Sequence, residues 1–158
     1  MIRAEGEVLI QADAKTVFAR LQDTAAIPSW RPDILEASAR DVATDRYTET
    51  MSFMGKKTQT FAVIEHEIDR AWTVRAIDGF SLRPTQRFRL EPAEGGATKL
   101  RYEIELPVTG GFVLMTPMLR IMIPRKWREY VERLKTAIEA RRRAGSTEPL
   151  DLVERSES

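Results

Sequence analysis

The order of the predicted elements constrains this chain most: one strand, a short helical pair, six strands in succession, and one long amphipathic helix. A twisted antiparallel sheet of this size cannot cover its own apolar face. The closing helix is the one segment long enough to do so. The order therefore predicts an α+β fold in which a seven-stranded antiparallel sheet wraps around the C-terminal helix, with a cavity between them.

The first 32 residues predict a strand followed by two short helices. Residues 2–11 alternate between apolar or small and mainly charged side chains, which is typical of a half-buried strand. Asp13 is suited to cap a helix, and residues 24–30 predict a second short helix that ends before Pro32. Both helices precede the second strand.

From Ile34 to Pro107 the sequence predicts six strands, joined by five turns. The predicted turns are Thr44-Asp45, Gly55-Lys56, Asp69-Arg70, Asp78-Gly79 and Gly95-Gly96. Alternation predicts that one set of side chains faces the concave side of the sheet and that their neighbours form charge pairs on the outer side. The inner set is Tyr47, Glu49, Met51, Phe53, Leu82, Pro84, Gln86, Phe88, Leu90, Leu100, Tyr102, Ile104 and Leu106. The outer set is Arg83, Arg87, Arg89, Lys99, Arg101, Glu103 and Glu105.

The closing helix carries one apolar stripe from Leu119 to Ile138, at spacings of three and four residues. Pro124 lies within the stripe and predicts a kink or the start of a second segment. Gly145 is a stop signal, and the polar residues after it show no helical period. We therefore expect a ligand-binding domain over residues 1–145 and a flexible polar tail over residues 146–158.

Composition excludes several functional classes. The chain has 158 residues, no cysteine and a formal net charge of +1. One domain is expected at this length, and the balanced charge argues against a nucleic-acid partner. The absence of cysteine excludes disulfides and thiolate chemistry, and residues 1–11 lack the pattern of an export signal. We expect a cytoplasmic location, and the oligomeric state stays open.

Four segments carry a resemblance that covers residues 2–143. They are Glu7–Phe18 (EVLIQADAKTVF), Ile27–Pro32 (IPSWRP), Thr98–Tyr102 (TKLRY) and Leu134–Glu139 (LKTAIE). Together they resemble the START-like, helix-grip superfamily (SRPBCC), which includes polyketide cyclases, aromatase/cyclases and lipid-transfer domains. The resemblance implies a hydrophobic pocket between the curved sheet and the last helix. It does not imply one reaction, because the scaffold hosts unrelated activities.

No strong catalytic motif is present. His66 is the one histidine, and no second histidine or cysteine accompanies it as a metal ligand. The sequence also lacks the motifs of serine hydrolases, P-loop proteins and dinucleotide-binding folds. We therefore expect no metal and no cofactor.

Glu49 is the candidate catalytic residue, since its strand phase places it on the inner face. A dry carboxyl there would have a raised pKa and could act as an acid or base for cyclisation, near Tyr102 or Tyr130. Alternatively, Glu49 pairs with a nearby arginine or lies at the pocket mouth. Gln86 could bind a ligand carbonyl or hold a tyrosine hydroxyl.

Aromatic side chains could surround a planar or lipid-like ligand, or they could belong to an ordinary core. The predicted ligand-binding residues are Trp30, Tyr47, Glu49, Phe53, Phe61, Trp72, Gln86, Phe88, Tyr102, Ile123, Trp127 and Tyr130.

A membrane is a second candidate partner. Residues 112–123 are mostly apolar, and the basic residues Arg125, Lys126 and Arg128 follow directly. This segment is too short to span a bilayer, and it either packs in the core or makes transient interfacial contact.

Three functions follow from these observations. The first is binding or transfer of a small hydrophobic or amphipathic ligand. The second is a cofactor-independent polyketide cyclase, aromatase or dehydratase, with Glu49 as acid or base. The third is a chaperone-associated interaction module, which requires an exposed apolar patch.

Overall fold

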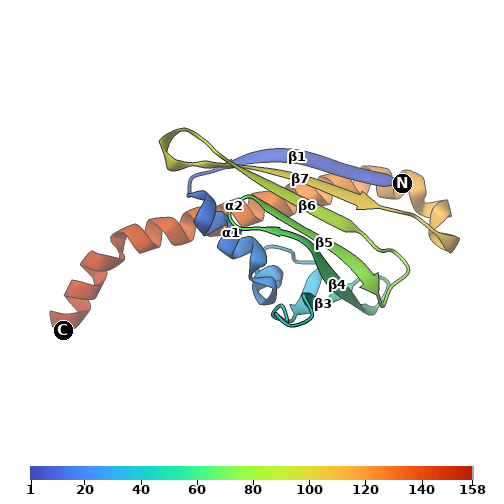
Figure 1. The fold of residues 1–158 in the computed structure, drawn as a ribbon, viewed down its shortest axis with the longest axis horizontal. Coiled ribbons are helices and arrows are strands. Elements are labelled where there is room, and N and C mark those ends of the chain that lie inside the picture. Colours follow the sequence, from blue (N-terminus) through green and yellow to red (C-terminus); the bar gives the residue numbers. More distant parts are fainter. Residues whose placement is uncertain (158) are drawn as a thin grey trace.

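The computed structural model describes the backbone of residues 1–157 and the side chains of residues 1–143. The elements follow the predicted order, with short 3-10 helices (η) beside the two α-helices (Figure 1). The strands are β1 (Ile2–Ile10), β2 (Ile34–Ala37), β3 (Arg46–Ser52), β4 (Lys56–Glu67), β5 (Ala71–Asp78), β6 (Thr85–Pro92) and β7 (Thr98–Leu106). The helices are α1 (Ala14–Gln22), η1 (Thr24–Ser29), η2 (Glu94–Gly96), η3 (Gly110–Met115) and α2 (Thr116–Glu157).

The seven strands form one antiparallel sheet in the order β1-β7-β6-β5-β4-β3-β2. The first strand therefore pairs with the last, and the other strands follow as a meander. In Figure 1, α2 runs along one face of this curved sheet, and α1 lies beside it at one end. This arrangement confirms the predicted α+β fold, including the two short helices between β1 and β2.

The predicted turns mark the strand connections, but β6 begins at Thr85, so Leu82 and Pro84 lie in the loop before it and not in the strand as expected. Two of the turns place an aspartate in the left-handed backbone region. Asp45 has a φ of 55° and Asp69 a φ of 62°. Aspartate tolerates this conformation better than most residues with a side chain. These two aspartates therefore mark where the chain turns before β3 and between β4 and β5.

The inner face of the sheet and one stripe of α2 form the core. Trp127, Leu134 and Ile138 of α2 are buried in one cluster with inward residues of the sheet such as Leu100. On β1, a Cβ atom at Gly6 would lie 2.6 Å from the Tyr102 hydroxyl oxygen of β7. Glycine at this position makes room for the tyrosine ring.

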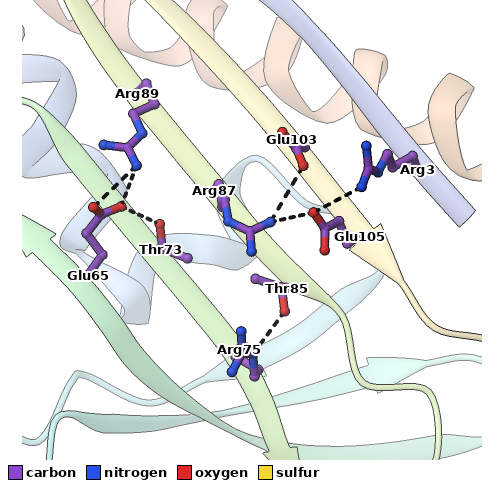
Figure 2. A network of polar contacts seen from close by, with 9 residues as sticks. All are labelled: Arg3, Glu65, Thr73, Arg75, Thr85, Arg87, Arg89, Glu103 and Glu105. Carbon is purple, nitrogen blue, oxygen red and sulfur yellow. Dashed lines mark hydrogen bonds and ion pairs between the residues drawn. The ribbon is translucent and has the colours of Figure 1, made fainter. Parts of the chain in front are cut away.

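The outer face carries the predicted charge pairs (Figure 2). The Arg87 guanidinium lies 2.7 Å from Glu105 and 3.6 Å from Glu103 on the neighbouring strand β7. Arg89 lies 3.1 Å from Glu65 on the other side. Such solvent-exposed pairs contribute about 0–1 kcal/mol each, so they favour solubility and strand register more than stability.

Helix α2 continues without a break through Pro124 and Gly145 and ends at Glu157. Gly145 therefore does not end the helix, although glycine inside a helix costs about 1 kcal/mol relative to alanine. The side chains of residues 144–158 lie outside the described part of the chain. The flexible polar tail expected for residues 146–158 stays a prediction.

Candidate functional site

A cavity of about 460 Å³ lies between the sheet and α2 and is partly open to solvent. Its apolar wall comes mainly from α2 on one side, and from strands β3 and β7 and the loop before β6 on the other. The apolar lining residues are Pro32, Met51, Phe53, Phe80, Leu82, Pro84, Ile104, Leu106, Leu119, Met122, Ile123 and Trp127. The polar lining residues include Arg31, Asp33, Gln59, Gln86, Lys126 and Tyr130.

Arg31 is the central polar residue of the cavity wall. It follows η1, where its backbone N–H donates to the Ile27 carbonyl oxygen at 2.9 Å. The Asp33 carbonyl oxygen accepts a 3.0 Å hydrogen bond from the Ser52 N–H, which ties this turn to the end of β3. The loop between η1 and β2 is thereby held over the inner face of the sheet.

The Arg31 guanidinium faces two carboxylates. One terminal nitrogen lies 2.9 Å from an Asp33 oxygen, and the other lies 3.4 Å from a Glu49 oxygen. The guanidinium carbon also lies 4.8 Å from the centre of the Trp127 ring and 5.6 Å from that of Tyr130. The cation is therefore held by ion pairs from one side and by aromatic rings from α2.

Burial shifts the protonation equilibria of this cluster. Glu49 is fully buried, and desolvation raises the pKa of its carboxyl despite the attraction of the Arg31 cation. Burial also raises the pKa of the Tyr130 hydroxyl to about 12, and the nearby Asp33 carboxylate adds to this shift. Burial alone would lower the pKa of Arg31, but Glu49 and Asp33 outweigh it and raise the value. Arg31 therefore stays charged, whereas Glu49 binds a proton more readily than a solvated glutamate does.

Three polar atoms of cavity-lining residues are buried and have no hydrogen-bond partner among the described side chains and backbone. They are Arg31 Nε, Asp33 Oδ1 and Gln59 Oε1. Gln59 is held in place because its amide nitrogen donates to the Leu82 carbonyl oxygen at 2.6 Å. Unpaired buried polar atoms are costly, so this part of the wall is suited to a polar group of a ligand or to water.

Three aromatic rings lie where the cavity meets solvent. Phe112 of η3 lies 6.2 Å from Phe53 and 5.4 Å from Phe80 between ring centres, and all three side chains are half-buried. Phe53 and Phe80 also line the cavity. We call these three residues the aromatic rim.

The structure brings part of the predicted ligand-binding set together. Phe53, Gln86, Ile123, Trp127 and Tyr130 line the cavity. The other seven predicted residues are buried in the core and are not among the residues that line the cavity. These seven are Trp30, Tyr47, Glu49, Phe61, Trp72, Phe88 and Tyr102.

Glu49 pairs with Arg31, which is one of the two interpretations left open by the sequence, and its raised pKa agrees with the prediction for a dry carboxyl. Its partner Arg31, rather than Glu49, forms part of the cavity wall. His66 lies against Phe18 and Trp72, at ring-centre distances of 5.5 and 5.4 Å. Within the described residues, no group of three histidine, aspartate or glutamate side chains could hold a metal ion.

Sequence reasoning missed Arg31, Asp33 and Gln59. The first two lie in an irregular loop, where no periodicity indicates which side chains point inward. Gln59 is paired directly with Glu49 across β3 and β4, so inward-facing Glu49 could have indicated it. The adjacent Trp30 and Pro32 are a weaker signal for a buried Arg31.

None of the helices in the described residues combines the length and apolar character that crossing a bilayer requires.

The curved sheet around one long helix, with a cavity between them, defines a helix-grip protein. The sequence matches the family described as polyketide cyclase/dehydrase and lipid transport over residues 1–139, and the chain belongs to that family. A search of curated proteins finds no match.

Solved structures with the same fold cover most of the chain. A START superfamily protein from Mycobacterium smegmatis matches with a TM-score of 0.71 at 20% identity, covering 87% of this chain and 97% of the other. The ZhuI aromatase/cyclase from Streptomyces sp. R1128 matches with a TM-score of 0.73 at 15% identity, covering 90% and 96%. A conserved protein from Geobacillus kaustophilus matches with a TM-score of 0.74 at 14% identity, covering 87% and 95%. At these identities the likeness establishes the fold.

Proposed function

We propose that the chain binds a small amphipathic molecule in the cavity between the sheet and α2. The apolar body of the ligand lies among Leu106, Leu119 and Ile123, and its polar group lies at Arg31 and Gln59. The observation that carries this proposal is the pairing of an apolar cavity with unpaired buried polar atoms on one part of its wall. Small-molecule sites combine these two features.

The size of the cavity supports a ligand with a compact ring system or a short chain. Its volume of about 460 Å³ falls within the range of about 300–1,000 Å³ that small-molecule sites occupy. Family membership supports the same class of ligand, since the family description includes lipid transport and polyketide chemistry.

The polar wall favours a neutral ligand that donates hydrogen bonds. Two of the three unpaired atoms, Asp33 Oδ1 and Gln59 Oε1, are acceptors. Arg31 is paired with two carboxylates, Asp33 and Glu49, and the other lining cation, Lys126, lies 3.8 Å from Glu129, so the wall offers no surplus positive charge to a ligand anion. A hydroxyl group satisfies these acceptors, whereas a carboxylate would face Asp33.

A cyclase or dehydratase remains the alternative, and the fold shared with the ZhuI aromatase/cyclase supports it. Its proposed acid or base is Glu49, which is not a lining residue of the cavity. Glu49 lies behind Arg31, with which it forms an ion pair. Binding or transfer is therefore the function that the geometry supports best. A chaperone-associated interaction module would bind its partner through a surface patch, and this function does not require a cavity.

The test is a calorimetric titration with 1-naphthol and 1-naphthoate, which share a ring system and differ in the polar group. We expect 1-naphthol to bind, and 1-naphthoate to bind about tenfold more weakly because an unpaired ligand charge is costly. Met122→Trp replaces an unbranched side chain of the cavity wall by a large ring. The ring should occupy the space of the ligand and abolish binding. Ile121→Trp, at the exposed neighbouring position, is the matched control and should bind normally.

Two results would contradict the proposal. If 1-naphthol fails to bind, or binds equally well to Met122→Trp, the cavity is not the binding site. If 1-naphthoate binds more tightly than 1-naphthol, the assignment of the polar wall to hydroxyl donors is wrong.

A further inference from the structure

An exposed apolar patch lies at one end of α2. Leu114 is 89% exposed, Ile121 67%, Val113 53% and Met118 48%. These residues come from η3 and the first turns of α2, at the end of the molecule where Figure 1 marks the N-terminus. Val113 also lines a shallow groove with Met1, which is itself largely exposed. Several neighbouring large apolar side chains in solvent indicate an interaction surface.

The exposed face of this segment changes from apolar to basic along the helix. Leu114, Met118 and Ile121 follow one another at spacings of four and three residues, and Arg125 and Arg128 continue the same exposed line. Residues 106–128 contain four basic residues and no acidic one. This end of the molecule is therefore apolar, and the next exposed residues along α2 are positively charged.

The aromatic rim connects this patch to the cavity. Phe112 directly precedes Val113 and Leu114, and its ring packs on the two rim residues that line the cavity. Met54, which follows Phe53 in the turn between β3 and β4, is also exposed. The apolar surface thus reaches the place where the cavity meets solvent.

We propose that this patch docks on an anionic lipid surface. The apolar side chains of η3 and the start of α2 enter the headgroup region, and Arg125 and Arg128 contact lipid phosphates. Docking in this orientation brings the aromatic rim to the membrane, so a ligand can pass between lipid and cavity with little exposure to water. The proposal rests on the surface and holds whether or not 1-naphthol binds in the cavity.

Charge favours lipid over a second copy of the chain. In a two-fold symmetric dimer that buries the apolar residues, Arg125 and Arg128 of both copies would find no acidic partner within residues 106–128, so their charge would add no attraction. An anionic membrane supplies the opposite charge to all of them at once. The basic residues therefore complement lipid phosphate and contribute nothing to self-association.

The test is cosedimentation of the full chain with vesicles of phosphatidylglycerol and phosphatidylcholine, compared with phosphatidylcholine alone. We expect binding to the anionic vesicles that weakens as salt is added. Leu114→Glu and Ile121→Glu should each reduce partitioning by about tenfold, because an apolar side chain that would enter the lipid is replaced by a charged one. Arg125→Gln and Arg128→Gln should each reduce it by about fivefold.

Two matched controls separate the patch from general effects of charge and exposure. Val42→Glu introduces the same charge at a site that is 77% exposed. Val42 precedes β3, whereas Met54 follows it, so the site is remote from the patch and partitioning should not change. Arg133→Gln removes one positive charge from an exposed site further along α2 and should change partitioning little.

Three outcomes would overturn the proposal. The first is no binding of the wild-type chain to anionic vesicles at low salt. The second is equal losses in the patch variants and the controls. The third is a dimer in sedimentation velocity that Leu114→Glu dissociates, together with no vesicle binding, which would assign the patch to a second copy.

Discussion

Replacing Arg31 by methionine isolates the electrostatic centre of the site. The substitution keeps an unbranched stem but removes the cation that lies 3.4 Å from Glu49 and 2.9 Å from Asp33. Asp33 is partly exposed and can be solvated, whereas Glu49 is fully buried. Removing one partner of a buried ion pair typically costs about 3–5 kcal/mol, because the other charge stays buried alone. We expect a loss of this size in the free energy of unfolding at neutral pH.

The loss should depend on pH. The pKa of Glu49 is already raised above 4.5 in the folded wild type, so the folded state holds its proton to higher pH than the unfolded state does. The contribution of Glu49 to stability is therefore greatest at low pH and falls as pH rises from 4.5 through its folded pKa. Without Arg31, the pKa of Glu49 rises further and the fall extends to higher pH. The difference in stability between the two proteins should thus be larger at pH 8 than at pH 5.

The assay is urea unfolding of the wild type, Arg31→Met, Glu49→Gln and the double variant, at both pH values. With a typical urea dependence, a loss of 3–5 kcal/mol lowers the midpoint by about 2 M. The double variant should regain most of the loss, because its buried amide carries no charge. The reasoning is refuted if Arg31→Met loses less than about 1 kcal/mol at pH 8, or if its loss is the same at both pH values.

Further predictions concern the tyrosines, the turns and the outer face. Absorbance at 295 nm should show no tyrosine ionising near pH 10 while the chain is folded, since burial raises all three tyrosine pKa values and that of Tyr130 to about 12; a folded-state midpoint near 10 would contradict this. Gly79→Ala should destabilise the chain in urea by more than about 2 kcal/mol, because φ is +103° and the new Cβ would lie 2.1 Å from a backbone oxygen. Gly55→Ala, with φ of +98° and open space around it, should cost only about 1 kcal/mol, and equal losses would refute the steric argument. Arg87→Ala should cost less than about 1 kcal/mol despite its two ion pairs, and a loss above 2 would show that the outer network is stabilising.

Hydrophobic periodicity and turn residues were enough to predict most of the fold. The alternation in β3, β6 and β7 correctly predicted which side chains face inward, and the apolar spacing from Leu119 to Ile138 predicted the helix that covers them. These signals succeed because each depends on one face of one element. They predict which face is buried and say nothing of the distance between elements.

The cavity depends on that distance, and this limited the prediction of the site. Phe88 and Gln86 share a face of β6, yet Gln86 lines the cavity while Phe88 packs in the core cluster with Trp127. The position of α2 along the sheet separates them, and no local pattern encodes it. Arg31 was missed for a related reason, since it reaches Glu49 from an irregular loop 18 residues away in the sequence.

Native mass spectrometry of the protein purified from its own host tests the central claim most directly. The account predicts that the wild type and Ile121→Trp retain the same small molecule, and that Met122→Trp, which narrows the cavity, does not. Retention of that molecule by Met122→Trp, or a wild type that carries no small molecule, would contradict the account.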